Sequence, residues 1–286
     1  MKKSIVLCLV VSGLLSLGFS GDRVRINGSD TMVNLVQKLS EVYMNKKPGL
    51  CSLSVNGGGS GTGIAALINQ KTDIANSSRP MKTKEIDQAK KKGIQPRQIA
   101  IGIDALSVIV NDKNPLTQLS METVGKIFKG EITNWQEIGG SNKPISLYGR
   151  QPNSGTFDFF REHVLAAEYS KNMHQMNGNS QIIESVRHDE GSIGYVGVAY
   201  VGQGGKLYKG IKILSISTGT GQSYTPLLEA NIISGKYPIA RELYQYIDTK
   251  SRRSVDDFIQ WELSKEGQKV VVNEGFYPIT DRLSKR

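Results

Sequence analysis

The chain has 286 residues, enough to bury one or two hydrophobic cores, and after its N-terminal segment no apolar run approaches the roughly 20 residues of a membrane-spanning helix. Its formal net charge is +10, but the lysines are scattered, and the densest group, residues 90–92, is expected on the exposed face of a helix. The composition therefore does not indicate nucleic acid as a partner.

The N-terminus has the composition of a secretory signal peptide. Two lysines precede about 13 mostly apolar residues, and small residues stand at the −3 and −1 positions before Gly21. We expect residues 1–20 to be a cleaved signal peptide, which would leave a net charge of +8. Cys8 lies inside the apolar run, so a lipid anchor at the cleavage point is not expected. The mature chain keeps Cys51 alone and cannot form an intrachain disulfide.

Short β-like runs then alternate with amphipathic helical runs, which is typical of an α/β protein. A long apolar stretch, residues 99–110, is expected to be a strand that leaves a first lobe. Before it, the predicted strands are 24–27, 53–55 and 73–76, and the predicted helices are 31–46, 63–69 and 83–92.

A second lobe is expected to follow, with helices over 120–128, 155–165 and 181–187 and strands over 145–148 and 193–196. Residues 211–215 are predicted to carry the chain back. Two helical segments, around 240–246 and 255–273, are expected to pack on the first lobe. The predicted organisation is thus lobe 1 over 21–105 and 216–286 and lobe 2 over 106–215, joined by strands.

Three predicted turns share one design, in which a strand leads through a turn rich in Gly and Ser or Thr into a helix. They are Gly28–Thr31, Gly57–Gly63 and Asn153–Thr156, and Arg150 precedes the third. A helix N-terminus offers unpaired N–H donors and a partial positive charge, and glycine lets an anion approach the backbone. One such turn is also what an ordinary N-cap looks like. Three of them together with one arginine predict a shared site for a small anion.

These segments resemble the phosphate-binding proteins of high-affinity phosphate ABC transporters, in order from about residue 24 to 280. The most specific parts are FKGEITNW at 128–135 and RQPNSGT at 150–156. The resemblance implies a two-lobed periplasmic binding protein fold of type II. In that fold each lobe is a mixed sheet flanked by helices, crossover strands join the lobes, and phosphate lies between them. We accordingly expect a periplasmic monomer that serves the permease of an ABC importer, without a cofactor.

The family's ligand contacts can be carried over position by position. They fall on Ser29, Asp30, Thr31, Ser60, Ser78, Arg150, Ser154, Gly155 and Thr156. Arg150 is expected to offer its guanidinium fork to two phosphate oxygens. Arg79 is expected in a structural ion pair.

Position 78 departs from the family pattern. Many relatives have an aspartate there, which accepts the proton of hydrogen phosphate and repels sulfate. Ser78 can donate or accept, so it leaves this discrimination less secure. Asp30 would either supply the missing acceptor or cap its own helix.

Enzyme signatures are not found in the sequence. His163, His174 and His188 lie outside the three turns, and no serine stands in a Gly-x-Ser-x-Gly motif. No spacing of His, Cys and carboxylates indicates a metal site, and Gly57–Gly63 lacks the Gly-Lys-Ser/Thr ending of a P-loop. Two alternatives stay open: the same fold binding sulfate, molybdate or tungstate, and a secreted phosphate-ester hydrolase.

Overall fold

The computed structural model describes residues 21–203, 206–219 and 221–279. The predicted signal peptide lies outside the described residues. Within the described part, no helix combines the length and the apolar composition that crossing a bilayer requires.

The first lobe is built on a mixed sheet. Three strands run parallel in the order β2-β1-β3, and two antiparallel strands, β13 and β4, extend the sheet from β3. Their bounds are β1 Asp22–Gly28, β2 Cys51–Gly58, β3 Ile74–Ser77, β4 Pro96–Asn111 and β13 Ala240–Asp248.

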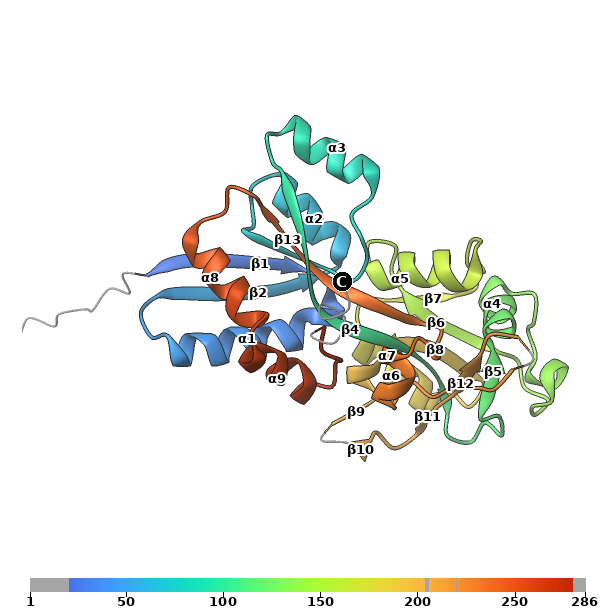
Figure 1. Cartoon of the computed structure of the whole chain (residues 1–286). Helices are drawn as coiled ribbons and strands as arrows, with labels where there is room; N and C mark the ends of the chain where they lie inside the picture. The colour runs from blue at the N-terminus through green and yellow to red at the C-terminus, as the bar shows by residue number, and fades with distance from the viewer. Residues whose placement is uncertain (1–20, 204–205, 220, 280–286) are drawn as a thin grey trace, which may run out of the picture.

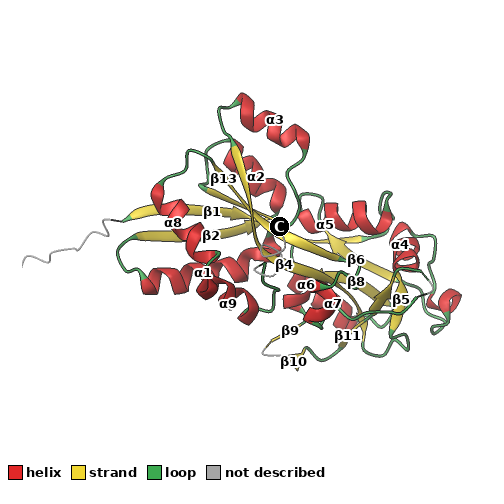
Figure 2. Ribbon diagram, viewed as in Figure 1, coloured by secondary structure: helices red, strands yellow, loops and turns green. Residues whose placement is uncertain are grey.

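Helices cover both faces of this sheet (Figure 2). On one face lie α1 (Val33–Lys46), α8 (Arg253–Glu262) and α9 (Lys265–Asn273), and on the other lie α2 (Ser60–Ile68) and α3 (Thr83–Lys91). Adjacent strand residues belong to opposite cores because successive side chains point to opposite faces. Ile74 thus packs with the first group of helices and Ala75 with the second.

The second lobe continues from the same long strand. The C-terminal half of β4 pairs with β8 (Ser192–Gly197) and β11 (Ile211–Ile213), and β6 (Ser146–Arg150) joins β8 to β7 (His174–Met176). Its helices are α4 Met121–Lys129, α5 Gly155–Phe160, α6 Asn179–His188 and α7 Glu229–Ile233, and a π turn, Arg161–Leu165, follows α5. The predicted α/β fold of two lobes, each a mixed sheet flanked by helices, is confirmed.

Several short elements complete the fold. The strands β5 (Gln118–Ser120) and β12 (Ser215–Ser217) pair in parallel, and β9 (Gly202–Gln203) pairs with β10 (Lys206–Leu207). Short 3-10 turns span Asp30–Met32, Trp135–Ile138 and Val198–Tyr200.

The predicted helix over 240–246 is wrong, because these residues form the strand β13 between β3 and β4. Ala240, Leu243, Tyr244 and Ile247 have helical spacing, which explains the prediction. In the strand, Arg241 and Gln245 are buried, and these polar residues interrupt the apolar alternation that would have indicated a strand. Hydrogen bonding to β3 and β4 outweighs the local preference of these residues for a helix.

The route back to the first lobe also differs from the prediction. Residues 211–213 form β11, which stays in the second sheet beside β4, and β13 makes the return (Figure 1). Ile216, Ile232 and Tyr237 pack in the core of the second lobe. The boundary at residue 216 stays a prediction, and this packing favours a boundary near Ala240. The segment predicted as helical over 255–273 is divided at Ser264, whose hydroxyl caps α9 by accepting from Gly267 N–H.

One carboxyl group in the first lobe is buried without a cation beside it. Glu262 of α8 has no exposed surface, and its Oε1 accepts a hydrogen bond of 3.3 Å from Gln245 Nε2. Its Oε2 has no hydrogen-bond partner in the described part of the chain. Burial raises the pKa of Glu262 well above its ordinary value, since the charged form would lose its hydration.

We therefore predict a pH-dependent gain in stability for Glu262→Gln. Because the folded chain holds this proton more tightly than the unfolded chain, the free energy of unfolding falls as the pH rises from the ordinary pKa toward the raised one. The loss is about 1.4 kcal/mol per pH unit within that interval. Urea unfolding should show the variant to be more stable than the parent chain at pH 8 and close to it at pH 4. Glu168→Gln, an exposed control, should show neither effect, and an equal difference at both pH values would contradict the prediction.

Candidate functional site

The first of the three turns ends β1 and brings Ser29 and Thr31 into the interior. Gly28 has a φ of 142°. A Cβ at this position would lie 2.1 Å from Asn76 O, so only glycine fits. Ser29 N–H donates to Asn76 O at 2.9 Å, and the Oγ atoms of Ser29 and Ser78 lie 3.1 Å apart. The end of β1 is thereby tied to the end of β3.

The second turn places Ser60 at the start of α2. Gly58 and Gly59 have φ angles of 110° and 92°, which allow the strand to reverse into the helix. Ser60 Oγ accepts a hydrogen bond of 3.0 Å from Ser78 N–H and lies 3.3 Å from Ser78 Oγ. Three buried hydroxyl groups of the first lobe, those of Ser29, Ser60 and Ser78, therefore form one cluster.

The third turn comes from the second lobe and meets the other two. Ser154 caps α5 by accepting from Thr156 N–H at 3.2 Å. A Cβ on Gly155 would lie 2.4 Å from Ser60 Oγ and 2.8 Å from Ser78 Oγ, so glycine is needed for this approach. Thr156 Oγ1 lies 3.0 Å from Thr31 Oγ1.

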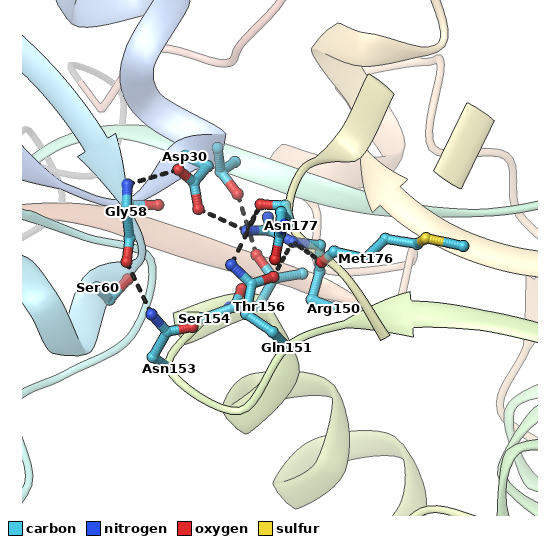
Figure 3. Close-up of polar contacts among 12 residues, drawn as sticks. Asp30, Gly58, Ser60, Arg150, Gln151, Asn153, Ser154, Thr156, Met176 and Asn177 are labelled. Atoms are coloured by element: carbon cyan, nitrogen blue, oxygen red, sulfur yellow. Dashed lines mark hydrogen bonds and ion pairs between the residues drawn. The ribbon is translucent and has the colours of Figure 1, made fainter. Parts of the chain in front are cut away.

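One backbone hydrogen bond and one from a side chain hold the second and third turns together. Gly61 N–H donates to Asn153 O at 3.0 Å, and Asn153 Nδ2 donates to Gly58 O at 2.9 Å (Figure 3). The two lobes are therefore closed on one another in this structure, and the three helix starts converge as the sequence predicted.

Arg150 enters the site from the end of β6 and is fully buried. Its Nη2 donates to Asp30 Oδ2 at 2.5 Å and to Asn177 O at 3.0 Å, and its Nε donates to Gln151 Oε1 at 3.1 Å (Figure 3). Its Nη1 has no hydrogen-bond partner among the residues that the structure describes. The protein thus occupies Nε and Nη2 of the guanidinium, while the expected contact of Arg150 with two phosphate oxygens stays a prediction.

A relay of hydroxyls fixes the backbone of Arg150. Its N–H donates to Tyr195 Oη at 3.1 Å, Tyr195 Oη lies 2.9 Å from Tyr169 Oη, and Tyr169 Oη donates to Phe157 O at 3.0 Å. Burial raises the pKa of Tyr195 to about 12, so this group stays neutral and keeps its proton. The relay ties the arginine to the helix that follows the third turn.

Asp30 connects the two lobes. Its Oδ1 accepts from Gly58 N–H at 2.7 Å, and its Oδ2 accepts from Arg150 Nη2. Within the part of the chain that the structure describes, the Asp30 side chain makes no cap bond to its own helix, so the capping alternative is wrong. Tyr200 Oη also donates to Asp30 O at 2.7 Å, which adds a second contact from the second lobe.

A second charged cluster joins the lobes beside the site, and it contains Arg79 in the ion pair that was expected. Arg79 donates to both oxygens of Glu85, at 2.7 and 2.8 Å. Its Nε lies 3.0 Å from Asp158 Oδ2 as an ion pair, and Lys82 Nζ lies 2.6 Å from the same oxygen. Asp158 lies on α5, two residues after Thr156, so this cluster spans the lobes directly beside the turns.

The structure brings all nine predicted site residues to one place, although their role as ligand contacts stays a prediction. Other residues of this region were not predicted as site residues, among them Asn153, Tyr200, Asp104 and Arg241. Of these, Asn153 stood inside a predicted turn, and the other three stood in no motif. In the described ranges, no group of three or more His, Cys, Asp and Glu side chains is placed to hold a metal ion.

Two lobes that close over convergent helix N-termini and a buried arginine define a substrate-binding protein for a small anion. Residues 18–266 match the family model of the PBP superfamily domain. The chain therefore belongs to this superfamily and, within it, to the PstS-like phosphate-binding proteins.

Individual relatives agree with this assignment. The chain is 29% identical over 287 residues to the phosphate-binding protein PstS of Pseudomonas aeruginosa, covering 94% of this chain and 86% of the relative. It is 30% identical over 248 residues to PstS of Staphylococcus haemolyticus, covering 84% and 76%. A phosphate ABC transporter substrate-binding protein of Clostridium perfringens, solved with bound phosphate, superposes with a TM-score of 0.79 at 26% identity, covering 90% and 99%.

We predict that Asp158→Asn loosens the contact between the lobes. The substitution removes the charge that Arg79 and Lys82 share across the cleft, while Arg79 keeps Glu85. The free energy of unfolding should fall by about 1–3 kcal/mol, and the radius of gyration from X-ray scattering should rise. Glu162→Gln removes an exposed carboxylate that contacts only its own lobe and should change neither value. Unchanged stability and scattering in Asp158→Asn would show that the cluster does not hold the lobes.

Proposed function

We propose that this protein captures inorganic phosphate between its two lobes and delivers it to an ABC importer, without carrying out chemistry on it. The proposed contacts are the hydroxyl groups and backbone N–H groups of the three turns, together with Arg150. These residues are Ser29, Asp30, Thr31, Ser60, Ser78, Arg150, Ser154, Gly155 and Thr156.

The observation that carries this proposal is the unpaired Nη1 of Arg150. A charged donor that is buried without an acceptor costs free energy, and such groups in native proteins call for an explanation. Here the group lies where two lobes bring together hydroxyls and helix N-termini, most of which can donate. An oxyanion supplies the acceptors that this cluster lacks.

The free energies of the proposed hydrogen bonds are of the size that reversible binding requires. Hydrogen bonds to a charged group contribute about 1.5–3 kcal/mol each. Roughly eight of them could offset the cost of dehydrating a dianion and closing the lobes, and still leave the about −8 kcal/mol of a micromolar complex.

The relatives support both the ligand and the partner. The names of the Pseudomonas and Staphylococcus proteins are those of phosphate-binding proteins, and the Clostridium protein is described as part of a phosphate ABC transporter with phosphate bound. This family is a class of substrate-binding proteins and not of enzymes. With the predicted signal peptide, these similarities support an extracytoplasmic protein that serves an ABC importer, and its monomeric state and its permease partner stay predictions.

A second candidate keeps the fold and changes the oxyanion. Ser78 Oγ lies near the hydroxyls of Ser29 and Ser60, where many relatives are expected to have a carboxylate. Both oxygens of Asp30 already accept from the protein. A site rich in donors at this position favours a fully deprotonated anion, and sulfate, molybdate and tungstate fit that description.

Removal of the guanidinium tests the proposed site. Arg150→Ala should weaken phosphate binding by about 2–5 kcal/mol, more than tenfold in dissociation constant, because neutral donors alone then hold the charge. Isothermal titration calorimetry would measure the loss, and thermal unfolding would confirm that the variant is folded. Arg97→Ala removes a guanidinium from a surface ion pair with Asp256 and should leave the affinity unchanged. Equal affinity in Arg150→Ala and the parent chain would remove Arg150 from the site.

Separate titrations with different oxyanions test the identity of the ligand. Calorimetric titration with phosphate, sulfate and molybdate at pH 5, 7 and 9 should show phosphate binding at least tenfold more tightly than the other two at pH 7. Tighter or equal binding of sulfate would overturn phosphate as the ligand and support the second candidate. Failure of all three to bind would overturn the site itself.

A further inference from the structure

A buried ion pair bridges the two strands that connect the lobes. Arg241 of β13 and Asp104 of β4 are register partners in the sheet, and both side chains are buried. Asp104 Oδ2 accepts from Arg241 Nε at 3.3 Å and from Arg241 Nη2 at 3.0 Å, and Asp104 Oδ1 accepts from Val198 N–H at 3.2 Å. β4 and β13 lie side by side where the first lobe passes into the second (Figure 1).

The same guanidinium reaches the third turn. Arg241 Nη2 donates to Thr156 Oγ1 at 2.8 Å. Arginine has donors only, so the Thr156 oxygen is always the acceptor in this bond. The single hydroxyl proton of Thr156 must therefore point elsewhere, either to Thr31 Oγ1 at 3.0 Å or to a ligand in the site.

This arrangement fixes the donor in each hydrogen bond, because the guanidinium of Arg241 can only donate. Asp104 accepts from Arg241, Arg241 donates to Thr156, and Thr156 donates into the site. A hydroxyl that accepts from a cation in a low-dielectric interior is also polarised, and becomes a stronger donor. Arg150 is near enough to matter electrostatically: burial lowers the pKa of Arg241, and the positive charge of Arg150 lowers it further, while Asp104 opposes both.

We propose that Arg241 is a positioning residue of the oxyanion site, which with Asp104 holds the Thr156 hydroxyl as a donor to the bound anion. This inference rests on the proposed function. It assigns to the connecting strands β4 and β13 a part in ligand recognition, because the guanidinium of Arg241 contacts both Asp104 of β4 and Thr156 of the site.

The test is a double-mutant cycle on phosphate affinity. Arg241→Met combined with Asp104→Asn removes the ion pair without leaving a buried charge unpaired, and the amide oxygen introduced by Asp104→Asn can still accept from Val198 N–H. Calorimetry would compare this paired variant, Thr156→Val, and the combination of all three substitutions with the parent chain. Thermal unfolding would establish that each is folded.

We expect the paired variant to weaken phosphate binding by about 10- to 100-fold in the parent background and by less than about threefold in the Thr156→Val background. An equal loss of affinity in both backgrounds would show that the ion pair acts independently of the Thr156 hydroxyl, and this would overturn the proposal. An unchanged affinity in the parent background would overturn it as well. If the paired variant does not fold, Arg241→Gln combined with Asp104→Asn replaces it in the same cycle, since this pair is also neutral and the shorter amide lacks the Nη2 that donates to Thr156.

Phosphate binding by the parent chain distinguishes a failure of this proposal from a failure of the proposed function. If the parent chain binds phosphate but the effects of the paired variant and of Thr156→Val are additive, the positioning role of Arg241 is overturned and the proposed function is not. A parent chain that binds none of phosphate, sulfate and molybdate would overturn the proposed function, and the positioning role with it.

Discussion

The burial of one guanidinium is the constraint on which the arrangement of the site depends. Arg150 has no exposed surface, so its charge has to be compensated by groups that the fold itself supplies. Asp30 of the opposite lobe, Asn177 O and Gln151 Oε1 satisfy Nη2 and Nε, and they leave Nη1 free in the described structure. Because Asp30 comes from the other lobe, satisfying this charge requires the lobes to be closed.

Helix starts surround this charge with donors that carry no net charge. Three turns place hydroxyls at the beginnings of helices, and glycines allow them to approach one another: Gly28 beside Asn76, and Gly155 beside Ser60 and Ser78. Neutral donors fixed on rigid elements need little reorganisation when a ligand enters and leaves. This suits the proposed function, in which the protein releases the anion that it binds and the contact with a charged side chain comes from one arginine that is itself paired.

Two charged clusters flank the site and connect it to different parts of the fold. Arg79, Lys82 and Asp158 lie at the contact of the lobes, while Asp104 and Arg241 lie on the connecting strands. The first cluster is close in sequence to two proposed contacts, since Arg79 follows Ser78 and Asp158 follows Thr156, and the second reaches Thr156 by a direct hydrogen bond. A few side chains therefore link the contact between the lobes, the connecting strands and the proposed ligand contacts.

The sequence alone was sufficient where the signal is local. Strand, glycine-rich turn and helix follow one another within about ten residues, so local conformational preferences predicted all three turns and the crossing strand β4. The tertiary structure decided what depends on distant partners. Residues 240–248 have helical spacing, yet form a strand because β3 and β4 supply hydrogen-bond partners on both edges. Asp30 pairs with Arg150, 120 positions away, and Asp104 pairs with Arg241, 137 positions away. No local sequence pattern predicts such pairs, because the burial of a charged side chain depends on which distant segments pack against it.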